Sequence, residues 1–229
     1  MNPVRNQGNG NCCYAYVVCG IMEILHQIEQ KNKKQRGGRF VLSPQDVYNN
    51  LIENKEEDSI GRSIKEALEW VCEHGCILET NCTYKGRFMP ITYLREPYMR
   101  VTTFRQINLQ QHVLSRTELE KCESKVREAI LIAPVAAHLI WINEMQQIKD
   151  GIYSGPKDEA SFDKTGDHGV IVVGFGQSTR NDELVKYWIV RNSHGKRWGN
   201  KGYGKINLAP THGRLLVQSV WIVRGLEKM

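Results

Sequence analysis

The sequence lacks a long hydrophobic run. No apolar stretch approaches the roughly 18 residues that a membrane-spanning helix needs. Met1 is followed by Asn2 and Pro3 and not by the apolar segment of a secretory leader. Internal repeats and low-complexity segments are also missing. We therefore expect neither a membrane span nor a membrane partner for these 229 residues.

Strong charge bias and metal-binding patterns are missing as well. The net charge of +6 is scattered, and the only basic cluster, residues 31–36, fits the C-terminal end of a helix. No nucleic-acid-binding signature accompanies it, so no nucleic-acid partner is expected. Cys72, Cys76 and Cys82 are close in sequence, but no histidine pair has zinc-finger spacing. We predict no metal and no cofactor.

What is present is the composition of an ordinary globular protein. Hydrophobic residues make up 41% of the chain and charged residues 24%. A chain of 229 residues can bury a sizeable core, as one large domain or as two small lobes.

One early stretch, residues 7–16, organises the rest of the chain. It is a loop of small residues that ends at Cys12 and Cys13, after which apolar residues follow at helical spacing. Cys13 should lie in the first turn of a buried helix. Free backbone N–H groups and the helix dipole at that end favour a thiolate, the nucleophilic form of cysteine. Taken alone, a cysteine such as Cys13 is more often a small buried hydrophobic residue than a nucleophile.

Two later stretches supply what a cysteine nucleophile needs. Asp167, His168 and Gly169 precede an apolar run, and Asn192 follows another such run. A thiol nucleophile requires a base that takes its proton and a third group that orients the base. Cys13, His168 and Asn192 provide these three residue types in that order.

This order resembles the papain-like cysteine proteases, in which the histidine and the asparagine follow the cysteine by roughly 130–150 residues. Here the separations are 155 and 179 residues, which predicts loop insertions. Further blocks are similar to family motifs in the same order along the chain; they are residues 4–8, 42–45, 61–75, 167–169, 192–195 and 198–203.

The resemblance implies an α+β fold of papain type. A helical N-terminal lobe (about 10–100) and an antiparallel, β-barrel-like C-terminal lobe (about 101–229) would form one catalytic domain over residues 1–229, with the active site in the cleft between them. It implies a monomer that cleaves peptide or protein substrates as an endopeptidase and that protein inhibitors can block.

The resemblance also assigns roles to residues. Cys13 is the nucleophile, His168 the base and Asn192 the group that orients the base. The side chain of Gln7 and the backbone N–H of Cys13 would stabilise the oxyanion. Gly61 and Arg62 match a glycine pair that binds substrate. Asp167, beside the base, is placed with the substrate-binding residues because the triad does not need it.

Several positions depart from the family pattern. His194 replaces a tryptophan that shields the His–Asn pair from water, Arg62 replaces the second glycine of the pair, and Tyr14 replaces the tryptophan after the nucleophile. Two alternatives to a protease therefore stay open. One is a catalytically weak or inactive homologue that binds peptides or proteins, and the other is a transferase that uses the same acyl-thioester chemistry.

The cysteines bear on the compartment. The family is normally made with a leader and an inhibitory pro-segment, neither of which is recognised here, so the chain is a shortened product, a fragment or a lineage without them. The family's first two disulfides would need cysteines at positions occupied by Gly10 and Ser59, and by Asn50 and Ile91. Both cysteines of each of these disulfides are missing, which fits a reducing compartment, where disulfides do not form. We expect a cytoplasmic protein, with the lysosome, vacuole or extracellular space as the alternative.

Periodicity and capping residues predict the remaining elements. Ser43 and Ser63 are the expected N-caps of two helices, and Gly75 is the expected stop of the second. Helices are expected at 13–31, 44–54, 63–74 and 117–132, and strands at 101–107, 135–142, 170–173, 185–190, 203–206 and 220–223.

Overall fold

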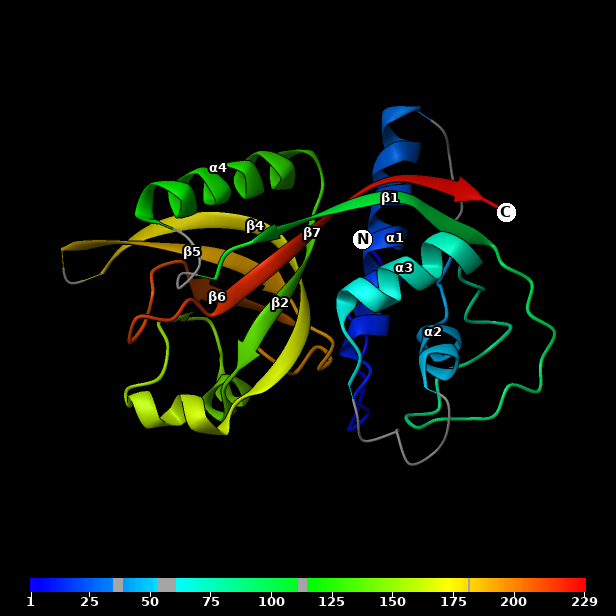
Figure 1. Cartoon of the computed structure of the whole chain (residues 1–229), viewed down its shortest axis with the longest axis horizontal. Coiled ribbons are helices and arrows are strands. Elements are labelled where there is room, and N and C mark those ends of the chain that lie inside the picture. The colour runs from blue at the N-terminus through cyan, green and yellow to red at the C-terminus, as the bar shows by residue number, and fades with distance from the viewer. Residues whose placement is uncertain (35–38, 53–60, 111–114, 181) are drawn as a thin grey trace. The chain divides into compact units, whose positions relative to one another are not determined.

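The computed structural model describes residues 1–229 except 35–38, 53–60, 111–114 and 181 (Figure 1). The described chain divides into two compact units. The helical unit comprises Met1–Pro3, Gln7–Arg105 and Val223–Met229, and the sheet unit comprises Val4–Asn6 and Gln106–Ile222.

Three helices form the core of the helical unit. They are α1 (Cys13–Asn32), α2 (Pro44–Leu51) and α3 (Ile64–His74), and each packs against the other two. All residues of α1 from Tyr14 to Leu25 are buried, which makes α1 the central helix of this unit, as the apolar pattern predicted.

The predicted caps start and stop these helices. The hydroxyl of Ser43 accepts a hydrogen bond from the backbone N–H of Asp46, and Pro44 is the first residue of α2. Ser63 and Glu66 form a reciprocal capping box at α3, and Gly75 ends that helix at φ 67°. The end of the helix predicted at 44–54 and the break predicted at Gly37 and Gly38 lie outside the described residues.

A buried carboxylate fastens α2 to the segment that follows α3. The side chain of Asp46 is 0% exposed and forms an ion pair with Arg95, whose Nε and Nη2 each lie 3.0 Å from a carboxylate oxygen. The hydroxyl of Tyr93 donates to the same carboxylate at 3.0 Å. These bonds compensate for removing the charge from water and hold residues 93–95 against α2.

The strands form one seven-stranded sheet of order β1-β7-β2-β4-β5-β6-β3. The pairs β2–β4, β2–β7, β4–β5 and β5–β6 are antiparallel, whereas β3–β6 is parallel. The sheet is therefore mixed and, over the described strands, open. The strands are β1 (Met99–Asn108), β2 (Val135–Trp141), β3 (Ile152–Tyr153), β4 (Gly166–Arg180), β5 (Glu183–Arg191), β6 (Tyr203–Asn207) and β7 (Val217–Lys228).

Helix α4 (Arg116–Ile132) packs on β4 and β2 in the sheet unit (Figure 1). Its N-cap is Ser115, so the helix begins one residue before the predicted start at residue 117. Short 3-10 helices lie at Asn143–Gln147 and Glu159–Lys164. The core beneath is built from branched apolar side chains, such as Val135, Leu139 and Val170, with Trp188 and Trp198 among them.

Two strands are much longer than predicted. Strand β4 begins at Gly166, four residues before the predicted 170–173, so His168 lies within the strand and not in a loop before it. Strand β7 extends to Lys228 instead of ending at 223. Both extensions contain polar residues and glycine, which carry little apolar signal. Among the described helices, none is long and apolar enough to cross a bilayer.

Candidate active site

His168 and Asn192 meet in the sheet unit. His168 is the third residue of β4, and Asn192 directly follows β5, its antiparallel neighbour. Nε2 of His168 lies 2.7 Å from Oδ1 of Asn192, and the two residues are only 6% and 4% exposed. The structure thus brings together two of the three residues that the sequence motifs singled out.

The hydrogen bonds around Asn192 fix the proton on His168. The backbone N–H of Ser193 donates to Oδ1 of Asn192 at 2.7 Å, and a backbone N–H can only donate. The atom that it contacts must therefore be the amide oxygen, and the ring nitrogen that faces this oxygen must carry a hydrogen. Neutral His168 is thus the Nε2–H tautomer, with the lone pair on Nδ1. Nδ1 is the atom that can accept a proton.

Burial keeps His168 neutral. Desolvation lowers its pKa to about 4, although the hydrogen bond to Asn192 acts in the opposite sense. His194 and His138 lower this pKa further through their charges. A nearby anion would be needed to make the imidazolium form of His168 stable at neutral pH.

Two aromatic rings cover His168. The centroid of Trp141 lies 4.6 Å from that of His168 and 4.9 Å from that of His194, and the two imidazoles are 4.8 Å apart. Sequence analysis missed Trp141, because its position in the apolar run 135–142 made it look like one more core residue. His194 occupies a buried environment that lowers its pKa by desolvation.

Asp167 points away from this pair. Neighbouring residues of a strand face opposite sides of the sheet, so Asp167 and His168 lie on different faces of β4. The carboxylate of Asp167 is 87% exposed and lies 2.8 Å from Nε2 of His138 on β2. Its contact in the structure is therefore His138, a second histidine that the sequence motifs did not indicate.

Cys13 and Gln7 belong to the helical unit. Cys13 is the first residue of α1 and is half-buried, as the sequence predicted. Gln7 is buried, and its Nε2 donates to the carbonyl of Gly10 at 2.7 Å. This bond closes the loop between Gln7 and α1, so the amide of Gln7 and the first turn of α1 are held in one short segment.

A tyrosine far along the chain supports this loop. The hydroxyl of Tyr84 donates to the carbonyl of Gln7 at 2.7 Å and lies 3.0 Å from the sulfur of Cys12. A side chain at Gly10 would collide with the same hydroxyl, since its Cβ would lie 2.5 Å away. Desolvation, followed by the charge of Cys12, raises the pKa of Tyr84, so the phenol stays protonated and can donate.

The two remaining predicted residues, Gly61 and Arg62, flank α3. A Cβ at Gly61 would lie 3.8 Å from the carbonyl oxygen of Asn11, which places Gly61 beside the loop that precedes Cys13. Nε of Arg62 donates to the carbonyl of Leu51 at 2.8 Å, at the end of α2. The guanidinium is thus anchored through Nε to the end of α2.

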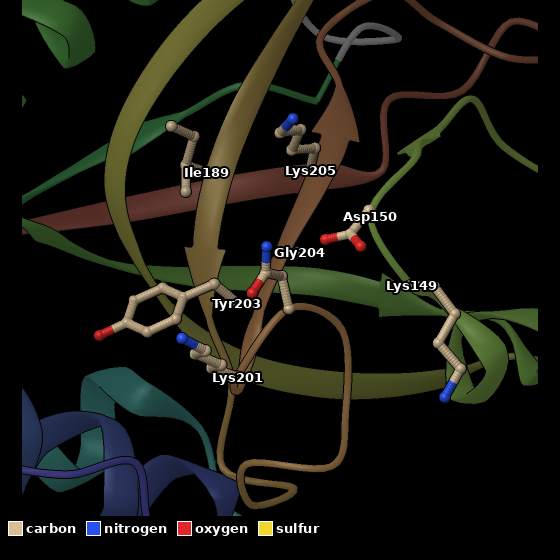
Figure 2. A pocket seen from close by; sticks show the side chains of 8 residues that line it. Lys149, Asp150, Ile189, Lys201, Tyr203, Gly204 and Lys205 are labelled. Atoms are coloured by element: carbon tan, nitrogen blue, oxygen red, sulfur yellow. The ribbon is translucent and has the colours of Figure 1, made fainter.

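Over the described parts of the chain, neither a metal site nor the hollow drawn in Figure 2 coincides with these residues. In the described parts of the chain, no three His, Cys, Asp or Glu side chains gather as metal ligands. Figure 2 shows a hollow of about 330 Å³ in the sheet unit that contains none of the predicted site residues. It is lined by Lys149, Asp150, Ile189, Asn200, Lys201, Tyr203, Gly204 and Lys205.

Comparison with known families identifies the chain. Residues 1–215 match the family described as papain family cysteine protease. The chain belongs to this family. Among papain-family relatives, procathepsin L of Rattus norvegicus is 30% identical over 208 residues, which cover 90% of this chain and 57% of that protein. Cathepsin 7 of Rattus norvegicus is 27% identical over 207 residues, 89% of this chain and 56% of that protein. The chain thus spans a little over half the length of these curated relatives.

Solved papain-family structures share the fold. A cysteine protease of Carica candamarcensis in complex with E-64 has a TM-score of 0.70 at 21% identity, with 97% of this chain and 92% of that chain covered. Bromelain of Ananas comosus in complex with the same inhibitor has a TM-score of 0.69 at 20% identity, with 97% and 93% covered. The papain-like α+β fold expected from the motifs is confirmed.

The relatives also bear on the compartment. They are cathepsins and plant cysteine proteases, which favours the lysosomal, vacuolar or extracellular alternative and gives no support to the cytoplasm. All seven cysteines of this papain-family chain are described, and none of them forms a disulfide.

Proposed function

We propose that this chain is a cysteine endopeptidase that uses Cys13 as nucleophile, His168 as base, Asn192 as orienting group and Gln7 as oxyanion donor. The observation that carries the proposal is the hydrogen bond between Nε2 of His168 and Oδ1 of Asn192 at 2.7 Å. It leaves Nδ1 as the only proton-accepting nitrogen of a buried imidazole, as a general base requires.

The nucleophile fits the same chemistry. Cys13 occupies the first turn of α1, where backbone N–H groups and the helix dipole favour a thiolate. Because burial disfavours a charged His168, the imidazolium needs a negative partner. The thiolate of Cys13 would be that partner, and the two charges would stabilise each other as an ion pair.

Chain continuity supports a joint site. Asn6 pairs with His194 in the sheet unit, and the backbone N–H of Gly195 donates to the carbonyl of Arg5 at 3.0 Å. Gln7, whose amide helps to close the loop before Cys13, is the next residue after Asn6. The chain therefore runs directly from Asn6, which pairs with His194, to Gln7, the predicted oxyanion donor.

The proposed reaction has two steps. The sulfur of Cys13 attacks the peptide carbonyl, Gln7 and the backbone N–H of Cys13 stabilise the oxyanion, and His168 gives a proton to the departing amine. Water, with His168 as base, then hydrolyses the thioester and releases the acid and the free thiol. One oxyanion donor is worth roughly 3–4 kcal/mol of transition-state stabilisation.

Active-site titration with E-64 and hydrolysis of a peptide library test the proposal. We expect one equivalent of inhibitor on Cys13 by mass spectrometry, and neither labelling nor hydrolysis in the Cys13→Ala variant. Cys122→Ala is the matched control, because Cys122 packs at the edge of the core of the sheet unit. Hydrolysis that survives in Cys13→Ala would overturn the assignment of the nucleophile.

The same experiments separate the alternatives. A folded chain that binds peptides but neither reacts with E-64 nor cleaves them would be the inactive homologue. An amine added to the reaction would be incorporated into the product if the chain were a transferase. The deviations at His194 and Arg62 make these outcomes worth measuring.

We further propose that Gly61 and Arg62 border the bound substrate and that Asp167 contacts it from the sheet unit. Gly61 lies beside the carbonyl of Asn11, and Asp167 exposes its carboxylate. Arg62 would favour acidic or small residues at its subsite. A cleavage profile that does not change in Arg62→Gly, or in Asp167→Asn, would remove that residue from the substrate site.

The proposed setting is that of most of the family: a monomer in the lysosome, the vacuole or outside the cell, acting on peptides or proteins and open to protein inhibitors. Light scattering of the purified chain tests the monomer. Fractionation of cells that express the natural gene product tests the compartment, and recovery in the cytosol alone would contradict it.

A further inference from the structure

Trp141 occupies a position that brings its ring onto the predicted base. It is the last residue of β2 and pairs with Gly166, while Leu139 pairs with His168. Trp141 and His168 are therefore diagonal neighbours on the same face of the sheet, where long side chains can meet. The centroid distance of 4.6 Å shows that these two rings do meet.

Trp141 contacts more than His168. Its ring lies edge-on to His194, with the centroids 4.9 Å apart, and it approaches Trp198, a buried residue of the same unit, to 6.2 Å. Trp198 is fixed in turn, since its Nε1 donates to the carbonyl of Met145 at 2.8 Å. Trp141 is thus held between a fixed core residue and two imidazoles.

This cover matters for the hydrogen bond beneath it. A hydrogen bond between a neutral imidazole and an amide is weak where water competes for both partners, and it strengthens where water is excluded. His168, the third residue of β4, is 6% exposed, and Asn192, which directly follows β5, is 4% exposed. His194 alone has a smaller ring than a tryptophan and, in addition, leaves its own buried Nδ1 without a partner among the described residues.

We propose that Trp141 is a positioning residue that excludes water from the His168–Asn192 hydrogen bond, and that His194 completes this cover. The chain would thereby have moved the large aromatic ring from the segment after Asn192 to the end of β2. The inference rests on the proposed function, since it concerns the base of that reaction. Its test does not need turnover.

The test measures the Nε2–H proton of His168 by NMR in the full chain. In the Cys13→Ala background, which lacks the thiolate and in which all the Trp141 variants are made, we expect slow exchange of this proton with water and a His168 pKa well below its ordinary value of 6.5. In Trp141→Ala, exchange should become at least about tenfold faster, as expected when a local barrier of about 1.4 kcal/mol is lost. The pKa of His168 should also rise, because desolvation is the main cause of its lowered pKa and the substitution admits water.

Matched variants separate shielding from a general loss of structure. Trp141→Phe keeps an aromatic ring over His168 and should restore slow exchange. Trp70→Ala removes a tryptophan that stacks on His74 in the helical unit, with centroids 5.3 Å apart, and should leave His168 unchanged. If Trp141→Ala does not fold, Trp141→Leu, which keeps apolar bulk but covers less of both imidazoles, takes its place with the same expectation.

Two results would overturn the inference. One is unchanged exchange and pKa of His168 in a folded Trp141→Ala or Trp141→Leu variant. The other is a shift of equal size in Trp141→Phe. The groups whose charges act on His168, His138 and His194, are titrated in the same spectra, so that a change in their charge is not mistaken for a change in hydration. Failure of E-64 to label Cys13 would end the proposed function and leave these measurements intact.

Discussion

The hydroxyl of Tyr84 donates a hydrogen bond to the backbone carbonyl of Gln7 at 2.7 Å, across 77 residues of chain. The same hydroxyl lies 3.0 Å from the sulfur of Cys12. One side chain thus joins both ends of the loop that carries the predicted oxyanion donor to the predicted nucleophile.

Replacing Tyr84 with phenylalanine should therefore loosen this loop. Losing one buried hydroxyl costs about 1 kcal/mol of the free energy of unfolding, and the misplacement of Gln7 should lower kcat more than it changes KM. Urea unfolding and peptide hydrolysis measure the two effects. Tyr153→Phe, which removes a hydroxyl 3.3 Å from Glu144, is the control and should change kcat little. Equal effects of the two substitutions on kcat would contradict a role for Tyr84 in the loop.

Removing the acceptor of the His168 hydrogen bond should reduce turnover. Asn192→Ala leaves the imidazole free to adopt the other tautomer, and we expect kcat to fall about 10²-fold. Asn192→Asp keeps an oxygen acceptor and adds a negative charge, so the pKa of His168 should rise. Steady-state kinetics over a range of pH distinguish the two variants. Full activity of Asn192→Ala would show that another group orients the base.

The lowered pKa of His168 predicts a loss of stability in acid. In the Cys13→Ala background, which lacks the thiolate, folded His168 has a pKa of about 4 against 6.5 in the unfolded chain. Between these values the unfolded state binds the additional proton, so the free energy of unfolding falls as pH drops from 6.5 towards 4. The contribution is at most about 3 kcal/mol.

Denaturant unfolding at several pH values measures this slope. His26 and His194 also have pKa values lowered by burial, so the contribution of His168 is the difference between Cys13→Ala and the double variant Cys13→Ala, His168→Gln. Identical slopes for the two proteins would mean that His168 is not buried as a neutral group.

The ion pair between Arg95 and Asp46 should be worth far more than a surface pair. Arg95→Ala leaves the fully buried carboxylate of Asp46 without its cation, which costs about 3–5 kcal/mol. Arg100→Ala removes a cation from the exposed Glu227 and should cost at most about 1 kcal/mol. Thermal and denaturant unfolding compare them. Similar losses in both variants would mean that water reaches Asp46.

Local signals predicted the helical elements well. Ser43 and Ser63 start helices by accepting hydrogen bonds from the first turn, and Gly75 stops one at a positive φ, so each signal is local in the sequence. The order of Cys13, His168 and Asn192 indicated the family, and the structure brings His168 and Asn192 together.

Register could not be predicted in the same way. Trp141 meets His168 only because β2 and β4 pair with Leu139 opposite His168, across almost 30 residues of chain. Nothing in residues 135–142 distinguishes this tryptophan from the core residues before it. Similarly, the contact of Arg62 with the carbonyl of Leu51 could not be predicted, because it is fixed by how α2 ends and not by the sequence around Arg62.

Each of the two compact units is built from segments that are not continuous in the sequence. The helical unit takes in Val223–Met229, and the sheet unit takes in Val4–Asn6. During synthesis, an N-terminal unit can usually mature while the remainder is still being translated. Here the first unit lacks its closing segment until residue 229 leaves the ribosome. A nick in β1 between Arg105 and Gln106 would accordingly liberate no self-sufficient half, and exchanging one half with a relative would require four junctions to be rebuilt at once.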